Sequence, residues 1–468
     1  MLTHLPRFYT RYIHGSDEVK ERIISFAAEK LVGTDVTKTE NFKDSQMLAC
    51  LSVRLALDFM PLRSGSSSKV ELKQIEQHMR VCLCIDPNTG SVKSISSSEP
   101  LLAEAATAVM NLPSFNPITA LSSEFRRPQI ERSPRGEIVV ALMQLLIRDE
   151  TLVKSSTQED LDKNNLFDFF TNTSQKRTML IVDFLQGFFA ARHKNTILQA
   201  APSHVTKKDE RSKLFSEVFK NSHCYFSHFV KLQSILMLTP SVLLALALRG
   251  ASVLCANCMP GVDIITPFLF NGDELKEENI SVILWQCKND KTYGVNPTKD
   301  LFNAMTPQRV GLSGGGNIFP NPVIRIVTSL ASQFPRTNEY PKKPICALRS
   351  LGDMETKAVN IKAHPYTSYD FWASGFGSEL YPVLDKPGVP WSANDWSKLL
   401  DSSIADATFK CKAGIYTEVM INLRRQAAPG ISLEGNHFKY LPEEIVVRGQ
   451  EITRKKKKVM TSVGSTHK

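Results

Sequence analysis

The sequence predicts an α/β protein in which a helical N-terminal domain is followed by an α/β core with a large helical insertion. Two observations support this prediction. Before Gly250, several segments place apolar residues three and four positions apart, which is the spacing of one helix face. After Gly250, short apolar runs alternate with turn residues, which is typical of strands. With 468 residues, the chain is long enough for about two to four domains.

The N-terminal domain is expected over residues 1–111 and is mostly helical. Ser16 can cap its first helix, and Gly33 is suited to end it because glycine readily adopts left-handed backbone angles. Pro100–Met110 also predicts a helix, since proline is favoured in the first helical turn. The other expected segments are a helix over 47–59, a flexible connector over 63–69, and a helix closing on a strand-like piece over 70–84.

Residues 111–134 are rich in Pro, Ser and Arg, and we place a domain boundary there. The core is then expected over residues 134–335. Its first helix, over 134–148, is apolar on almost all sides, which predicts that it is buried. The polar stretch 149–174 is interpreted as an insertion.

Two further helices are expected before the strands, over 179–191 and 214–238. The second would carry His223 and His228 as packing residues. The core elements that follow are strands over 251–257, 262–270, 280–287 and 323–330, a helix near 299–305, and a Gly-rich connection over 311–316. A C-terminal extension is expected over 336–450 and a basic, disordered tail over 451–468.

Charge and composition favour an intracellular protein with a polyanionic partner. The net charge is +10, and half of it comes from the five consecutive basic residues 454–458, a run that fits a nuclear-import signal or a phosphate-binding tail. The nine cysteines form no disulfide pattern, and Cys255 and Cys258 have no second pair to complete a zinc site. We expect no signal peptide and no membrane association, because the apolar stretches are too short to span a bilayer.

The chemistry is predicted at two neighbouring strands. Gln286 and Lys288 are two positions apart, so in a strand their side chains point to the same face. Asp263 begins the preceding strand, just after Gly261-Val262. A carboxylate, an amide oxygen and an ammonium group can therefore meet at one point.

This set of groups suits cleavage of a phosphodiester. Mg²⁺ prefers oxygen ligands and keeps several waters, so the carboxylate of Asp263 and the amide oxygen of Gln286 can hold it. A bound divalent cation stabilises charge on the phosphate and lowers the pKa of an attacking water. Lys288 can orient that water and offset the negative charge of the transition state.

Asp263 followed by Gln286-Cys287-Lys288 resembles the PD-(D/E)XK nuclease motif in its Gln-x-Lys variant, as found in Mrr-type restriction enzymes. The resemblance implies a restriction-endonuclease-like α/β core that uses Mg²⁺. It also implies an acidic metal ligand on a helix before the first strand. Glu137 is the candidate, because it is the one carboxylate on the apolar stripe of the helix over 134–148, and a large insertion would then separate it from Asp263.

More widely, residues 20–290 resemble large fungal proteins related to the Crinkler type, which join a P-loop ATPase to such a nuclease domain. The matching stretches include Ser98–Ala106, Arg135–Glu137, Phe226–Phe229 and Arg249-Gly250. The sequence has no G-x-x-x-x-G-K-[ST] motif, so residues 1–111 are expected to be the remnant of an ATPase helical lid that binds no nucleotide.

Two function classes follow from this resemblance. The first is a metal-dependent nuclease that hydrolyses DNA with Asp263, Gln286, Lys288 and Glu137. The second is a catalytically inactive effector or nucleic-acid-binding module that keeps the fold. Gln286 leaves this question open, because an amide in place of an acid removes one negative charge that would bind the metal.

Overall fold

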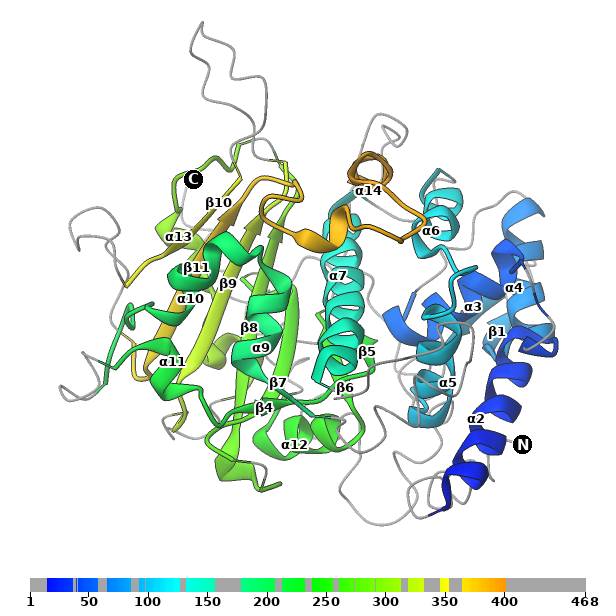
Figure 1. The fold of residues 1–468 in the computed structure, drawn as a ribbon, viewed down its shortest axis with the longest axis horizontal. Helices are drawn as coiled ribbons and strands as arrows, with labels where there is room; N and C mark the ends of the chain where they lie inside the picture. Colours follow the sequence, from blue (N-terminus) through cyan, green and yellow to red (C-terminus); the bar gives the residue numbers. More distant parts are fainter. Residues whose placement is uncertain are drawn as a thin grey trace, which may run out of the picture.

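The computed structural model describes residues 15–36, 39, 41–57, 65–85, 92–96, 98–126, 132–155, 178–206, 213–231, 238–255, 261–272, 274–290, 292–312, 319–331, 346–352 and 364–400. Most of the expected polar insertion, residues 313–316 of the Gly-rich connection, and the basic tail lie outside these ranges. Figure 1 shows a group of N-terminal helices on one side, a β-sheet on the other, and a long helix between them. The expected mixed α/β architecture is confirmed at this level.

The N-terminal part is helical, as expected. It contains α2 (Asp17–Val32), α3 (Asp44–Leu55), α4 (Gly65–Gln77), α5 (Pro100–Met110) and α6 (Pro117–Arg126), with the antiparallel hairpin β1 (Val81–Ile85) and β2 (Val92–Ile95). Ser16 stands at the N-cap position of α2 without a side-chain hydrogen bond, and Gly33 ends the helix in the left-handed conformation at φ 74°.

The flexible connector expected over 63–69 is wrong from Gly65 onward, because α4 begins there. Gly and Ser have weak helical preference, so tertiary contacts decide the conformation of this segment. Further along α4, the Gln74 side chain donates a hydrogen bond of 2.8 Å to the backbone carbonyl of Ser45, and the buried Glu71 accepts one from Ser94 of β2. These contacts hold α4 against α3 and the hairpin.

The helix between the two parts is α7 (Arg132–Ser155), and its buried character is confirmed. Residues Val139 to Leu145 of α7 are all fully buried. One hydrophobic core includes residues of α2, α3, α5, α7 and the sheet. At mid-helix, Gln144 accepts a 3.2 Å hydrogen bond from Thr266 of strand β7, which fixes α7 on one face of the sheet.

Within the described residues, the main sheet has nine strands. They are β3 (Met179–Leu180), β4 (His223–Cys224), β5 (His228–Lys231), β6 (Ala251–Leu254), β7 (Ile264–Leu269), β8 (Ile280–Lys288), β9 (Val323–Ser329), β10 (Ala347–Ser350) and β11 (Ser368–Ser374). The path runs β10-β11-β9-β8-β7-β4-β3, and β6 and β5 branch from β7.

The branch arises because β7 has two neighbours along one edge. Its first residues, Ile264 and Ile265, pair with β6, and its last residues, Phe268 and Leu269, pair with β4. β7 is antiparallel to β6 and β8, whereas β9 is parallel to β8 and reached through α13 (Lys299–Ala304). The short strand β5 is parallel to β6 and is joined to it through α12 (Pro240–Leu248).

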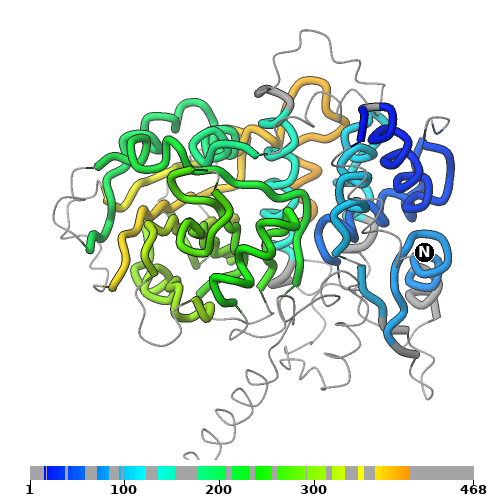
Figure 2. The backbone as a smooth tube through the Cα atoms, turned by 90° about the horizontal axis from the view of Figure 1, so that it is seen from below, coloured from blue at the N-terminus to red at the C-terminus, as the bar shows by residue number. Residues whose placement is uncertain are grey.

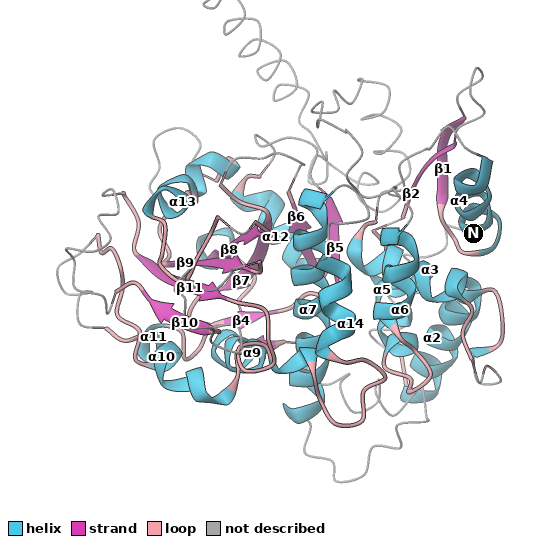
Figure 3. Cartoon of the chain, turned by 90° about the horizontal axis from the view of Figure 1, so that it is seen from above, coloured by secondary structure: helices cyan, strands magenta, loops and turns pink. Residues whose placement is uncertain are grey.

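Helices cover both faces of this sheet. Ile283 and Trp285 of β8 pack on the side of α7, α9 (Ile181–Phe188) and α11 (Phe215–Val218). Val282 and Leu284 pack on the other side, with α12 and α13. Figure 3 shows these two layers above and below the strands, and Figure 2 shows the N-terminal helices beyond α7. The remaining described helices are α10 (Lys194–Leu198), α14 (Ala393–Leu400) and the 3₁₀ turns 191–193, 277–279, 307–310 and 382–384.

The expected helix over 214–238 is wrong. Among the described residues of this range, 214–231 and 238, only 215–218 is helical, and His223 and His228 lie in β4 and β5. His223 pairs with Leu269, and His228 pairs with Ala251. The aromatic spacing of this segment suits a helix, but backbone pairing with strands that come later in the chain outweighs local preference.

Candidate metal centre

The predicted site lies where β7 begins and β8 ends, and a glycine sets the approach of the chain. Gly261 has φ +97°, a conformation that favours glycine, and a Cβ there would lie 2.3 Å from the backbone oxygen of Ala304. The last turn of α13 therefore packs directly on the chain two residues before Asp263. This contact explains why glycine opens the segment.

Asp263 is fixed by its backbone on both sides. Its N–H donates to the carbonyl of Trp285 at 2.8 Å, and its carbonyl accepts from the N–H of Cys255 at 2.8 Å. The Asp263 Oδ2 atom accepts a 2.6 Å hydrogen bond from the Cys287 N–H. The carboxylate thus accepts a hydrogen bond that a backbone carbonyl would accept if the pairing of β7 with β8 continued.

Gln286 lies just beyond the paired part of β7 and β8, because the register ends at Ile264 with Trp285 and the Asp263 N–H bonds to the Trp285 carbonyl. The Gln286 side chain is only 4% exposed, and its Oε1 atom has no hydrogen-bond partner. Leaving a buried amide oxygen without a hydrogen-bond donor costs free energy. A bound cation at this atom would offset that cost.

Lys288 follows on the same face at the end of β8. Its Nζ atom lies 5.7 Å from the ring centroid of Tyr293, and its carbonyl accepts from the N–H of Leu330. Both contacts hold the lysine at the end of the strand, near the carboxylate of Asp263.

Glu137 reaches the site from the first turns of α7. The adjacent Gly136 lies against the end of β8, since a Cβ on it would be 3.3 Å from the Cβ of Asn289. Glu137 is partly buried. The structure therefore brings Glu137, Asp263, Gln286 and Lys288 to one end of the sheet, although α7 and the face that carries Gln286 lie on different sides of the strands.

The electrostatics of the two carboxyl groups show that they are close. Burial and then the charge of Asp263 raise the pKa of Glu137 well above its usual range, whereas Lys231 and Lys288 lower it. Burial raises the pKa of Asp263 to about 6, against the opposing effects of the Cys287 N–H and Lys288. Two nearby carboxylates repel each other when both are ionised, which is an arrangement that a divalent cation relieves.

Sequence reasoning missed Lys231, which acts on Glu137 from the end of β5. It was missed because residues 214–238 were expected to be helical. The signal that could have found it is the alternation Phe229-Val230-Lys231, in which Phe229 and Val230 pack into the two different cores.

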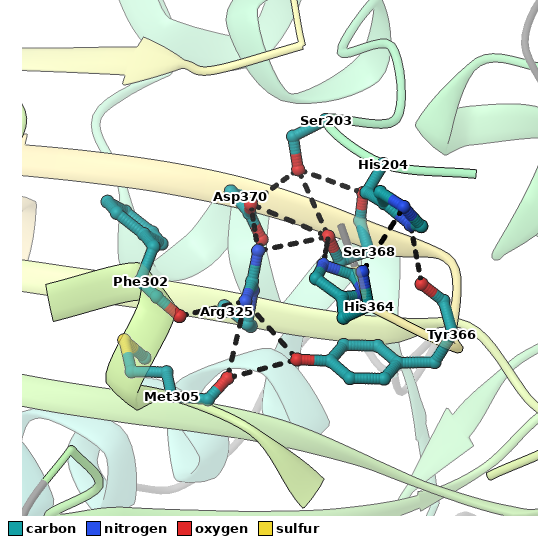
Figure 4. Close-up of polar contacts among 9 residues, drawn as sticks. All are labelled: Ser203, His204, Phe302, Met305, Arg325, His364, Tyr366, Ser368 and Asp370. Carbon is teal, nitrogen blue, oxygen red and sulfur yellow. Dashed lines mark hydrogen bonds and ion pairs between the residues drawn. The ribbon is translucent and has the colours of Figure 1, made fainter. Parts of the chain in front are cut away.

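A second polar cluster lies on the α13 side of the sheet (Figure 4). Arg325 of β9 is fully buried and pairs with Asp370 of β11, with an Nε–Oδ1 distance of 2.6 Å. The same guanidinium donates to the carbonyls of Phe302 at 2.9 Å and Met305 at 3.3 Å. Arg325 therefore binds the C-terminal end of α13, next to the turn that packs on Gly261.

Two histidines complete this cluster. His204 Nδ1 donates to the Tyr366 carbonyl at 3.0 Å, and its other ring nitrogen accepts from the His364 N–H at 3.4 Å. Burial, then Arg325 and His204, lower the pKa of His364 to about 2, so this ring is neutral, and its Nε2 lies 3.3 Å from the Ser368 hydroxyl. The contacts shown in Figure 4 join β9, β11 and the loop at Ser203 into one structural unit.

Metal binding at the site would depend on its oxygen atoms. Among the described residues, no three His, Cys, Asp or Glu side chains form a cluster that could hold a metal ion. The set at the end of β7 and β8 differs from such a cluster, since it has two carboxylates and one amide oxygen. Cys258, the second cysteine of the C-x-x-C spacing, lies outside the described ranges. Burial, followed by the charges of Asp263 and Glu137, raises the pKa of Cys255 well above its usual value.

Comparison with known proteins gives one match. The chain matches the family "Domain of unknown function (DUF8736)" over residues 38–223. This range contains α3 to α11 and includes Glu137, but it ends before Asp263, Gln286 and Lys288. No curated protein and no solved structure matches the chain. Across the described ranges, none of the helices combines the length and apolar character that a bilayer-spanning segment needs.

Proposed function

We propose that the protein is a metal-dependent nuclease that hydrolyses phosphodiester bonds in DNA. The observation that carries this proposal is the buried Oε1 atom of Gln286, which has no hydrogen-bond partner and lies at the end of β8, where the next residue, Cys287, donates its N–H to the Asp263 carboxylate. Together with Glu137, Gln286 and Asp263 offer a hard divalent cation three oxygen donors. Burial above all raises the pKa of both carboxyl groups, and a bound cation would favour their ionised forms.

The residues present fit Mg²⁺. Asp263, Gln286 and Glu137 would hold it, and when bound it would supply charge stabilisation at the phosphate and a more acidic water. Lys288 would remain beside Asp263, where its ammonium group can orient the attacking water and stabilise the developing negative charge. Gly261 packs against the end of α13 two residues before Asp263, which supports the backbone position of this carboxylate.

The fold gives further support. The resemblance to PD-(D/E)XK nucleases implies an acidic residue on a helix that precedes the strands, and α7 carries Glu137 in that order and packs on β8. The preference for DNA rests on the resemblance and on the net charge of +10, which suits a polyanion.

Cleavage of plasmid DNA by the full-length protein, in the presence of Mg²⁺ or Mn²⁺, tests this proposal. We expect Asp263→Ala and Lys288→Ala to slow cleavage by about 100-fold or more, because each removes a group that acts on the transition state. Asp300→Ala and Lys220→Ala are the matched controls, since both side chains are exposed, Asp300 on the first turn of α13 and Lys220 before β4. Equal cleavage by the Asp263→Ala variant and the wild type would refute the site.

The second candidate function is an inactive nuclease-fold module that binds nucleic acid. The observation that favours it is Gln286 itself, since an amide ligand binds a hard cation less strongly than a carboxylate does. Gln286→Glu separates the two functions. An active wild type should keep or increase its rate at low Mg²⁺ in this variant, whereas an inert wild type that gains cleavage would be a decayed nuclease.

A further inference from the structure

Lys288 is the last residue of β8 and shares a face of the sheet with Gln286. Val282 and Leu284 lie on the same face, since all four are two positions apart, and both pack into the core with α12 and α13. The Lys288 carbonyl accepts a 2.8 Å hydrogen bond from the N–H of Leu330, which fixes its backbone. This bond does not fix the ammonium group, because a lysine carries its charge on a flexible four-carbon stem.

The contact that locates the amine is with an aromatic ring. The Lys288 Nζ atom lies over the ring of Tyr293, 5.7 Å from its centroid. This distance is within the range of about 6 Å over which the negative face of an aromatic ring attracts a cation. The ion pairs among the described residues join other side chains, so none of them holds this amine.

Tyr293 is itself held by the sheet, in the loop that follows β8. Ser329 of β9 is the register partner of Lys288, and its hydroxyl donates a 2.8 Å hydrogen bond to the Tyr293 carbonyl. The Trp372 Nε1 of β11 donates to the carbonyl of Gly294 at 3.3 Å. The Tyr293 side chain packs against the core that contains Trp372. The ring therefore has a fixed place on the face that carries Lys288.

An aromatic ring suits the role proposed for Lys288 better than a carboxylate would. A carboxylate at ion-pair distance would neutralise the ammonium charge and accept its N–H donors. A ring attracts the cation through its quadrupole, so the amine keeps its positive charge for the reacting phosphate. Holding a long side chain in place before the reaction also removes the cost of ordering it in the transition state.

We propose that Tyr293 is a positioning residue for phosphodiester hydrolysis, and that its ring holds the Lys288 ammonium group in the site. This inference rests on the proposed function for the role of Lys288. Tyr293 does not act on the reacting atoms itself, and its effect on the rate passes through the amine.

Plasmid cleavage by the full-length protein with Mg²⁺ measures this effect. Tyr293→Leu keeps an apolar side chain but removes the aromatic face, so kcat should fall about tenfold while KM stays within about twofold. Tyr293→Phe keeps the ring and should restore kcat to within about twofold of the wild type. Thr292→Ala is the matched control, because Thr292 is the exposed neighbour of Tyr293 and bonds to Asp290 through its backbone N–H.

A second readout does not depend on cleavage. After reductive methylation with carbon-13 formaldehyde, the NMR signal of Lys288 in the metal-free protein reports the ring, because nuclei over an aromatic face are shifted upfield. The Lys288→Arg variant identifies this signal by its absence. The signal should move toward that of an exposed lysine in Tyr293→Leu and stay in place in Tyr293→Phe. A melting temperature of Tyr293→Leu equal to that of Thr292→Ala excludes a general loss of structure.

The outcomes separate this inference from the proposed function. A wild type that cleaves DNA, with an unchanged kcat or an unchanged Lys288 signal in Tyr293→Leu, would refute the positioning role alone. Raised KM with unchanged kcat would also overturn it, since Tyr293 would then bind substrate directly. Equal loss of kcat in Tyr293→Phe and Tyr293→Leu would exclude the ring as the cause. A wild type that cleaves no DNA, with a Lys288 signal that moves in Tyr293→Leu, would refute the nuclease and keep the contact between ring and amine.

Discussion

The buried ion pair between Arg54 and Asp149 gives the most quantitative prediction about stability. Arg54 of α3 is fully buried, and its two terminal nitrogens donate to the two Asp149 oxygens at 2.7 and 2.9 Å. Arg148 Nη1 adds a third contact, at 2.9 Å from Asp149 Oδ1. One carboxylate therefore forms ion pairs with two guanidinium groups that are almost completely buried.

Asp149→Asn keeps the shape of the side chain but removes its charge. The variant leaves Arg54 as a buried cation without its carboxylate partner and Arg148 with only the charge of Glu104 nearby. Its amide group also presents a donor to one of the two arginines. Breaking a buried pair from one side costs about 3–5 kcal/mol. A typical domain has only about 5–15 kcal/mol of unfolding free energy, so this single change should remove a large part of it.

Urea denaturation of the full-length protein, followed by tryptophan fluorescence, measures this cost. Glu18→Gln is the control, because it breaks the exposed pair of Glu18 with Arg22, where side-chain exposures are 72% and 79%; the expected loss is below about 0.5 kcal/mol. Arg54→Met combined with Asp149→Asn should cost less than the sum of the single changes, since one unpaired cation is removed. A loss below about 1 kcal/mol for Asp149→Asn would contradict the buried pairing.

Three further predictions concern the site and the N-terminal part. Gly261→Ala should destabilise the protein and slow cleavage, because φ +97° and the Ala304 oxygen at 2.3 Å leave no room for a Cβ; thermal melting and plasmid cleavage measure both effects. Because the pKa of Asp263 is raised to about 6, the unfolded chain loses this proton first, so metal-free stability should fall as pH rises from about 4 to about 6. Mn²⁺ should bind and raise the melting temperature more strongly above pH 6 than below it, and Asp263→Asn should weaken this dependence, which then rests on Glu137 alone. Calorimetry with ATP and the full-length protein should show no binding, since the sequence has no P-loop motif.

Much of the local structure could be predicted from the sequence because its signals are short-range. Proline at the start of Pro100–Met110 and the apolar surface of α7 predicted these helices, and both are confirmed. The two-residue period of β8 predicted that Gln286 and Lys288 share a face at a strand end. The expected neighbouring position of the strands that carry Asp263 and Gln286 is also confirmed, since β7 pairs with β8.

Other features depended on contacts between residues far apart in the sequence. The segment 223–231 has an aromatic spacing that suits a helix, yet it forms β4 and β5 because later strands supply its hydrogen-bond partners. Lys231 enters the site only through that pairing. Arg325 gave no local signal either, since its partner Asp370 and the helix end at Met305 come from separate parts of the chain.

The sequence by itself determined which residues carry the candidate chemistry, because Asp263, Gln286 and Lys288 stand at the ends of strands whose alternation is a local property. Tertiary structure alone decided what surrounds them. Glu137 precedes Asp263 by a long stretch of chain, and only the packing of α7 on β8 brings it close enough for the charge of Asp263 to raise the pKa of Glu137. Local periodicity fixes the direction of a side chain within its own element, whereas the burial and charge that tune its pKa come from elements that the fold places beside it.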